Sequence, residues 1–386
     1  MKKLLLFFVF VTLLFHAIPV FAQEGEFVMD KVETVKAKVL EVLDQEVKNV
    51  PGTDVTSTYQ TIKVEILQGS KKDTVITVVN DYLSLKKGEV FYLVHTTNSL
   101  EGRDTYSVSE PYRLPVVLFF VGLFIFLVFL FGGIQGMRGL LSLGGSLVLI
   151  LYVLIPGVLQ GYSPVLVSLG VASLIIILGS FVTHGFNKTT ASAVIGMIVT
   201  ILVTGVLAYV AVYWSRLSGF SDETAVYLNL NTRGSIDFVG LLLGGMLIGL
   251  LGVLYDVAIG QAISVEELHT IAPHISRVTI YKRAIRIGRE HIGALVNTLA
   301  IAYVGVSLPL LLLYSQSSTE SIGVTLNREL FATEIIRTMI GSIGLVIAVP
   351  ITTIICVFML MRKASPVSKE KIEKEKHALE HVGHHH

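Results

Sequence analysis

The fold is decided by residues 115–133, PVVLFFVGLFIFLVFLFGG, a run without a charged side chain. The apolar character continues well beyond it, since Arg138 is the only charged residue between Pro115 and Phe181. A helix of about 20 mostly apolar residues is long enough to cross the hydrocarbon core of a bilayer. The stretch therefore predicts membrane-spanning helices rather than buried helices of a soluble protein.

Similar runs follow along the chain, and only 15% of all residues are charged, against about 25% in a soluble domain. Together they predict an α-helical multi-pass membrane bundle of about seven transmembrane helices, within a membrane domain at residues 114–362. The predicted spans are 116–133, 140–159, 164–182, 191–214, 238–262, 292–314 and 338–361. The one cysteine, Cys356, falls within the last of these, so an intramolecular disulfide is excluded.

Residues 1–22 have the three-part pattern of a signal peptide. Lys2 and Lys3 precede the apolar run 4–15, and the small-residue site 20–22 follows Pro19. The run is short for a span, which favours cleavage over an uncleaved signal anchor. Under either interpretation, residue 23 onward lies outside the cell.

The distribution of basic residues gives the same orientation. Seven spans that start outside place nine Lys and Arg residues in the inner loops and at the start of the tail: Arg138, Lys188, Arg277, Lys282, Arg283, Arg286, Arg289, Arg362 and Lys363. The outer loops carry three: Arg216, Arg233 and Arg328. Because basic residues are enriched on the cytoplasmic side, we expect a bacterial cell-membrane protein with a cytoplasmic C-terminus. The tail, 363–386, is charged and rich in histidine, and we interpret it as a solvated tail rather than a site.

Residues 23–113 are polar and predict a small extracytoplasmic β-barrel-like domain of the OB or SH3-like kind. The clearest strand is 61–67, where Ile62, Val64 and Ile66 alternate with polar residues. Four further strands are expected near 33–43, 74–80, 89–95 and 104–109, separated by glycine-containing turns. His95 and the lysines of this domain are expected to be solvated.

The fifth predicted span carries a carboxylate, Asp256, on the same helical face as Gly245, Gly249 and Gly252. Small residues allow close helix approach in membranes, so this face is expected to pack against a neighbouring helix. An intramembrane carboxylate is costly and is a functional candidate by default. The alternative is that Asp256 only caps a packing interface near the cytosolic end.

A second polar group is predicted at the same depth. The fifth span runs inward and the sixth outward, so Asn297 should lie level with Asp256, with Gln261 and Thr298 close to that layer. Together these four residues predict a polar vestibule open to the cytosol. Gly305 continues a second small-residue stripe on the sixth span, where Pro309 predicts a kink.

The inner loop 264–291 is predicted to contain an amphipathic helix. Its apolar residues recur at helical spacing, and a different face carries the basic surface Lys282, Arg283, Arg286 and Arg289. Such a helix suits the anionic inner leaflet of the bilayer. Docking of a cytosolic partner on the same surface is the alternative.

Common enzyme signatures are missing from the sequence: it has no nucleophile elbow, no Walker loop and no Rossmann glycine set. The inner loop has acidic residues and histidines, but it lacks an HExxH motif or a cysteine pair. We therefore expect no enzyme, cofactor, bound metal or nucleic-acid partner. The bilayer is the expected partner, and a homo-oligomer or an unidentified membrane partner is left open.

Three segments resemble the YibE/F-like family of bacterial multi-pass membrane proteins. They are 252–261 (GVLYDVAIGQ), 287–293 (IGREHIG) and 297–310 (NTLAIAYVGVSLPL), the last being the most specific. The family has an aspartate where this chain has Glu290, which keeps the charge. The resemblance implies a multi-pass membrane protein and supplies no catalytic or ligand residues.

Two functions of different kinds follow from these observations. The first is a transporter, permease or export component that uses the polar intramembrane site. The second is a non-transporting envelope protein that acts in partner binding, sensing or assembly.

Overall fold

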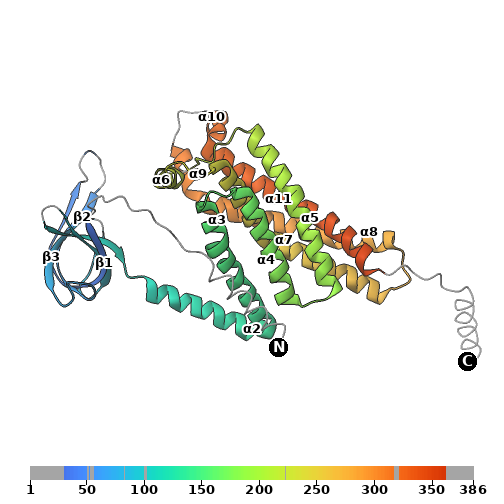
Figure 1. The fold of residues 1–386 in the computed structure, drawn as a ribbon, viewed down its shortest axis with the longest axis horizontal. Coiled ribbons are helices and arrows are strands. Elements are labelled where there is room, and N and C mark those ends of the chain that lie inside the picture. The colour runs from blue at the N-terminus through green and yellow to red at the C-terminus, as the bar shows by residue number, and fades with distance from the viewer. Residues whose placement is uncertain are drawn as a thin grey trace, which may run out of the picture. The chain divides into compact units, whose positions relative to one another are not determined.

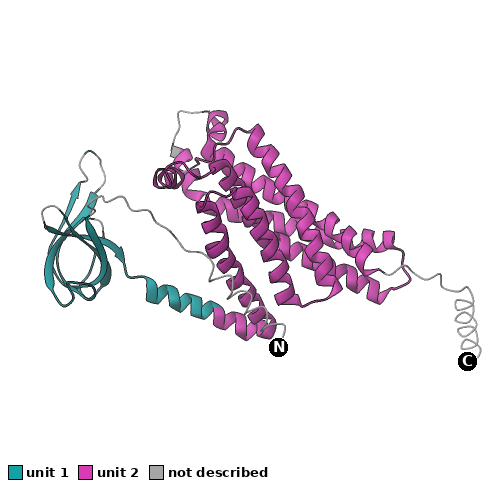
Figure 2. Cartoon of the chain, viewed as in Figure 1, with its two compact units in different colours: residues 1–124 teal, residues 125–386 magenta. Residues whose placement is uncertain are grey.

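The computed structural model describes residues 30–49, 52, 56–81, 83–99, 102–221, 223–316 and 321–361. The predicted signal segment and the tail 363–386 lie outside these residues. The chain divides into two compact units, residues 1–124 and 125–386, which are coloured separately in Figure 2.

The first unit contains a curved five-stranded antiparallel sheet (Figure 1). Its strands are β1 (Lys31–Asn49), β2 (Thr56–Ile66), β3 (Val75–Asn80), β4 (Val90–Thr97) and β5 (Asp104–Pro111). The order β3-β2-β1-β4-β5 places the long β1 in the centre, and β3 and β5 approach each other where the half-barrel curls round. The predicted β-rich domain is thus confirmed as an N-terminal half-barrel sheet, and we call it the outer domain after its predicted side of the membrane.

The inward faces of these strands form the core of the domain. Alternate residues point inward, as in Val35, Ala37 and Val39 of β1, and each of these is almost fully buried. Large side chains fill the centre, including Ile62 and Phe91. This is the alternation that the sequence predicted for a half-buried strand.

Two buried amides close the sheet against the segment that follows β3. Gln60 accepts a hydrogen bond from the Leu85 backbone N–H (2.8 Å) and donates one to the Leu85 carbonyl (3.0 Å). The Asn80 amide donates to Gln60 Oε1 (3.2 Å). Because a buried polar group without a partner is costly, these bonds stabilise the segment against the core.

The second unit is helical. Its longer helices are α2 (Leu114–Leu149, which starts in the first unit), α4 (Pro164–His184), α5 (Lys188–Trp214), α7 (Phe238–Ile271), α8 (Arg277–Val306) and α11 (Glu329–Leu360). A π-helical turn (Ile150–Leu154) leads from α2 to α3 (Ile155–Leu159), and the remaining short helices are α6 (Glu223–Asn231), α9 (Leu308–Gln316) and α10 (Ile322–Asn327). Helix α11 packs against α5, α7 and α8, while α7 also packs against α4 and α5 (Figure 1).

The number of candidate spans depends on how broken helices are counted. Among the described residues, five helices are long and apolar enough to cross a membrane, or six if α8 and α9 form one bent span. One of the five is the continuous stretch Leu114–Leu159, where the sequence predicts two spans. Helix α2 has a non-helical residue, Gly133 (φ 51°, ψ −141°), at the predicted end of the first span. A multi-pass helical bundle is confirmed, and seven spans remain a prediction.

The inner loop 264–291 is largely helical. Helix α7 continues past the predicted end of its span to Ile271, and α8 begins at Arg277, so only five residues separate the two helices. The predicted amphipathic segment and the first part of the predicted sixth span, as far as Val306, thus form one helix, α8. It bends by 62° at its junction with α9, close to Pro309.

Small residues bring the helices of the bundle into close contact. A Cβ added at Gly196 of α5 would lie 2.7 Å from Thr352 Oγ1 of α11. One added at Gly344 of α11 would lie 2.9 Å from Thr204 Oγ1 of α5. Backbone approach of this kind is typical of helix packing in membranes.

Candidate functional site

The predicted glycine face of α7 lies on the outside of the bundle. Gly245, Gly249, Gly252 and Asp256 are all exposed, whereas the opposite side of α7 is buried against α4, α5 and α11. Leu254 and Ala258 on that buried side have no exposed surface. We expected this glycine face to pack against a neighbouring helix; among the described residues α7 packs mainly through its other face, and of the three glycines only Gly249 lies against another helix, α8.

Helix α8 lies beside this face, and one contact between the two helices shows which of their residues lie at the same depth. A Cβ added at Gly249 would lie 3.3 Å from the hydroxyl of Tyr303, so these two residues are neighbours. Asp256 is seven residues along α7 from Gly249, or ~10.5 Å. Asn297 is six residues back along the antiparallel α8 from Tyr303, or ~9 Å. Counted from this contact, Asp256 and Asn297 differ in depth by ~1.5 Å, and counted from the contact between Gln261 and Gly288 they differ by ~6 Å. The two residues therefore lie within about one helical turn of the same level.

The polar groups of this layer are also exposed. Asn297, Thr298 and Gly305 all lie on the outward side of α8. The Thr298 hydroxyl donates to the Ala294 carbonyl of its own helix (2.9 Å). No hydrogen bond or ion pair of the Asp256 side chain is found within the described part of the chain. The structure thus places a carboxylate and an amide on one open face of two adjacent helices.

Gln261, the fourth residue of the predicted vestibule, faces the opposite way. Its side chain is buried, and Gln261 Oε1 accepts a hydrogen bond from the Thr353 hydroxyl of α11 (2.9 Å). Its amide nitrogen lies directly against Gly288, where a Cβ would clash. Gln261 therefore joins α7, α8 and α11 in the core and is separate from the Asp256 layer.

A small hollow lies at the end of the bundle where α4 leads into α5. It encloses about 160 Å³ and is lined by His184, Asn187, Thr189, Thr190, Ile259, Ala262, Ile263 and Glu266. Ile263 is two helical turns beyond Asp256 on nearly the same face of α7. The polar lining is at the end of the bundle that the basic residues predict to be cytosolic.

The basic surface of α8 is exposed as expected, while its apolar side is not free. Lys282, Arg283, Arg286 and Arg289 are exposed. Ile280 and Ala284 are buried in the main core of the bundle. Arg277 also donates to the Met361 carbonyl at the end of α11 (2.8 Å). The start of α8 is therefore held against the other helices through its apolar side.

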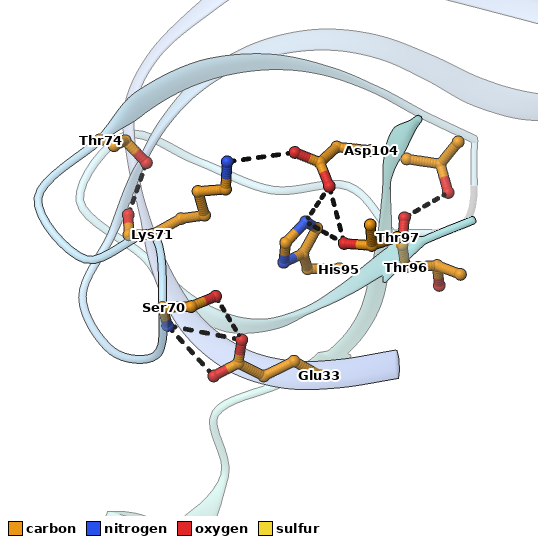
Figure 3. Close-up of polar contacts among 9 residues, drawn as sticks. Glu33, Ser70, Lys71, Thr74, His95, Thr96, Thr97 and Asp104 are labelled. Atoms are coloured by element: carbon orange, nitrogen blue, oxygen red, sulfur yellow. Dashed lines mark hydrogen bonds and ion pairs between the residues drawn. The ribbon is translucent and has the colours of Figure 1, made fainter. Parts of the chain in front are cut away.

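A second polar cluster lies in the outer domain and was not expected (Figure 3). Its centre is Asp104 at the start of β5. The Asp104 carboxylate contacts His95 Nε2 at 2.8 Å, accepts from the Thr97 hydroxyl at 2.7 Å and pairs with Lys71 Nζ at 3.2 Å. These bonds connect the β2–β3 loop to β4 and β5.

Glu33 holds the same loop from the other side. The Ser70 hydroxyl donates to Glu33 Oε2 (2.7 Å), and this bond holds the pKa of Glu33 below its usual value. Hydrogen bonds from His95, Thr97 and Lys71 hold the pKa of Asp104 well below its usual value. A pocket of about 390 Å³ opens beside these residues.

The expectation that His95 is solvated was wrong. His95 is 5% exposed and stacks on Tyr106, with a ring-centroid distance of 4.8 Å. It follows Phe91 and Leu93 at alternating positions of β4, so it points inward with them. The alternation along the strand could have predicted this position, because residues 91, 93 and 95 point to the same face of β4.

Comparison with protein families decides where the chain belongs. The family model described as YibE/F-like protein matches residues 120–362, more than half of the chain. The chain belongs to the YibE/F-like family. No curated protein and no solved structure gives a significant match to it.

The family match covers one of the two candidate sites of this YibE/F-like protein and not the other. Asp256, Asn297, Gln261 and Thr298 all lie within the matched residues, whereas the cluster around Asp104 lies before them. Among the described residues, no group of three or more His, Cys, Asp or Glu side chains is arranged to hold a metal ion.

Proposed function

We propose that this YibE/F-like protein is a transport component of the bacterial cell membrane and that Asp256 is its ionisable group. The observation that carries the proposal is the shared layer of Asp256 and Asn297 on adjacent apolar helices. Carboxylates within membrane spans commonly serve as proton relays or ion sites. An amide at the same level supplies both a donor and an acceptor for a polar substrate or for water.

The hollow beside α7 supports an inner entrance to this layer. It carries two ionisable side chains: Glu266, ten residues or ~15 Å along α7 from Asp256, and His184, whose ring lies 5.8 Å from that of Tyr255. A polar route from one end of the bundle to a carboxylate is what an ion or proton pathway requires. In this proposal, residues 23–113 lie outside, and the hollow and the basic surface of α8 lie inside.

Charge-removing and size-removing changes at Asp256 test the role. A deletion strain is screened against metals, ions and envelope stresses, and its phenotype is then complemented with variants. Asp256→Asn should assemble with unchanged thermal stability in detergent but should fail to complement, because the charge is lost. Asp256→Ala should fail as well. Glu267→Gln, an exposed carboxylate farther along α7, is the matched control and should complement.

Full complementation by Asp256→Asn, together with destabilisation by Asp256→Ala alone, would reject the transport role. Asp256 would then be a hydrogen-bonded packing group whose loss leaves a partner unsatisfied, at a cost of about 1–3 kcal/mol.

Orientation has its own test. We expect Lys72→Cys in the outer domain to react with an impermeant thiol reagent on intact cells. Arg283→Cys should react only after permeabilisation. The wild-type chain is the blank because its single cysteine, Cys356, is fully buried. The reverse pattern would overturn the proposed topology.

A second candidate function rests on the pocket of the outer domain. The pocket is lined by both basic and acidic residues, including Lys31, Lys71, Glu33 and Asp104. In this alternative, the protein is a non-transporting envelope factor whose outer domain binds a polar ligand or partner. The same complementation assay separates the two functions. Failure of Lys31→Ala with success of Asp256→Asn would favour the envelope factor.

A further inference from the structure

The open face of α7 and α8 has an unusual combination of features for a surface within the membrane. Gly245 and Gly252 have no heavy atom within 4 Å of an added Cβ, and the same is true of Gly305 on α8. Small residues therefore line both helices on the outside of the bundle. An ionisable side chain, Asp256, lies on the same face.

Lipid is a poor neighbour for this face. Acyl chains offer no hydrogen-bond donor to a carboxylate, and ionisable residues within spans nearly always face other protein groups or water. Glycine stripes, in turn, allow the backbone of another helix to approach closely. Both features indicate that a further protein surface covers the face.

The same face carries both the Asp256 carboxylate and a hydrogen-bond donor that could bind a carboxylate. Asp256 offers acceptor oxygens, while the Asn297 amide offers donors in nearly the same layer. A two-fold axis along the membrane normal keeps every residue at its depth. A dimer with this axis therefore places Asp256 of one copy at the depth of Asn297 of the other. By symmetry, Asn297 of the first copy lies at the depth of Asp256 of the second. In such a dimer, the glycines of α7 in one copy would pack against the small residues of α8 in the other copy, at a neighbouring depth.

We infer that the α7–α8 face joins two copies of this chain, and that Asn297 of one copy completes the hydrogen bonding of Asp256 in the other. A second copy fits better than an unrelated protein, because donor, acceptor and small-residue stripes all lie on one patch at matching depth. The inference does not depend on transport, since an envelope factor could pair in the same way.

Cross-linking between two differently tagged copies tests the contact in native membranes. One copy carries Gly252→Cys and the other carries Ile301→Cys, both exposed positions within about a turn of the same level. Oxidation should give a band that contains both tags, at least fivefold stronger than the control. The control pairs Gly252→Cys with Tyr209→Cys, an exposed position on α5. The buried Cys356 alone is the blank.

A second variant addresses the proposed hydrogen bonds. Adding Asp256→Leu to both copies should reduce the cross-link several-fold, whereas Asp256→Asn, which keeps an acceptor oxygen, should largely retain it. A two-tag band no stronger than the control would overturn the inference. A band that joins one copy to a different protein would also overturn it. Because these readouts need no activity, they stand apart from the test of transport.

Discussion

Both units bury large apolar side chains, but neighbouring helices of the bundle also meet closely at glycines. The outer domain buries large residues, such as Ile62, Leu93 and Phe91, at the centre of its sheet. The helical bundle brings its backbones together at Gly196 and Gly344. The difference follows from the solvent, because apolar burial stabilises a domain in water but supplies little force between helices in lipid.

Buried polar groups differ in the same way. In the outer domain, the amide of Gln60 bonds the Leu85 backbone, 25 residues away. In the bundle, the buried Thr200 hydroxyl bonds the Gly196 carbonyl of its own helix, and others, such as those of Thr204 and Thr352, have no partner among the described residues. The hydroxyls of the bundle therefore act mainly as small residues that permit close packing, and the bond between Gln261 and Thr353 is an exception that connects two helices.

The largest expected effect concerns a large side chain of the outer domain. Phe91→Ala removes a fully buried ring and should cost about 3–5 kcal/mol. We expect the isolated domain, residues 23–113, to give a β-type circular dichroism spectrum and a cooperative melt. The variant should be unfolded at room temperature, because a domain of this size has little stability to lose. Val79→Ala, at an exposed position of β3, is the control and should change the melt little. A helical or disordered spectrum of the parent domain would contradict the proposed fold.

The next largest effect is expected in the bundle, where a single methyl group is added at a helix contact. Gly196→Ala places a Cβ against Thr352, including its Cα at 3.0 Å, so α5 and α11 must move apart. We expect a loss of about 1–3 kcal/mol, measured as a lower melting temperature in detergent. Gly260→Ala on α7 has open space around the new methyl group and should be neutral or slightly stabilising. Equal effects of the two variants would show that close backbone approach is unimportant.

The smallest expected effect is a pH dependence confined to the outer domain. The folded-state pKa of Asp104 is lowered by bonds from His95, Thr97 and Lys71. A lowered pKa stabilises the fold above the unfolded value, about 3.9, and this stability is lost as pH falls towards the folded value. Chemical denaturation at pH 6 and pH 3 should therefore show a smaller acid loss for Asp104→Asn than for the wild type. Asp81→Asn, at an exposed position, should keep the wild-type dependence.

Much of the outer domain could be predicted from its alternating residues. All five strands were expected close to their observed positions, but β1 extends to Asn49, beyond the predicted end at residue 43. Its last residues are polar and exposed, so they lack the apolar alternation that marks a strand. His95 was missed because its residue type suggested solvent, although its position in β4 placed it inside.

The intramembrane residues could be predicted in part. Helical spacing placed Asp256 on one face with three glycines, and the antiparallel order placed Asn297 at its level. Spacing does not say which face a neighbour covers, because α7 is apolar or small all round and has no polar side to mark its exterior. The outward position of Asp256 and the inward position of Gln261 therefore required the packing of α4, α5 and α11.

In the proposed topology, the break at Gly133 decides whether the number of membrane crossings is even or odd. A straight helix through Leu114–Leu159 would be ~69 Å long, more than twice the ~30 Å of the hydrocarbon core. If the bent α8–α9 pair is one crossing, the described residues after the outer domain supply six crossings with this stretch counted once, and seven if Gly133 divides it. An even number returns the tail to the side of the outer domain, and an odd number takes it to the opposite side. In the proposed topology, the backbone conformation of one glycine thus determines which compartment receives the last residues of the chain.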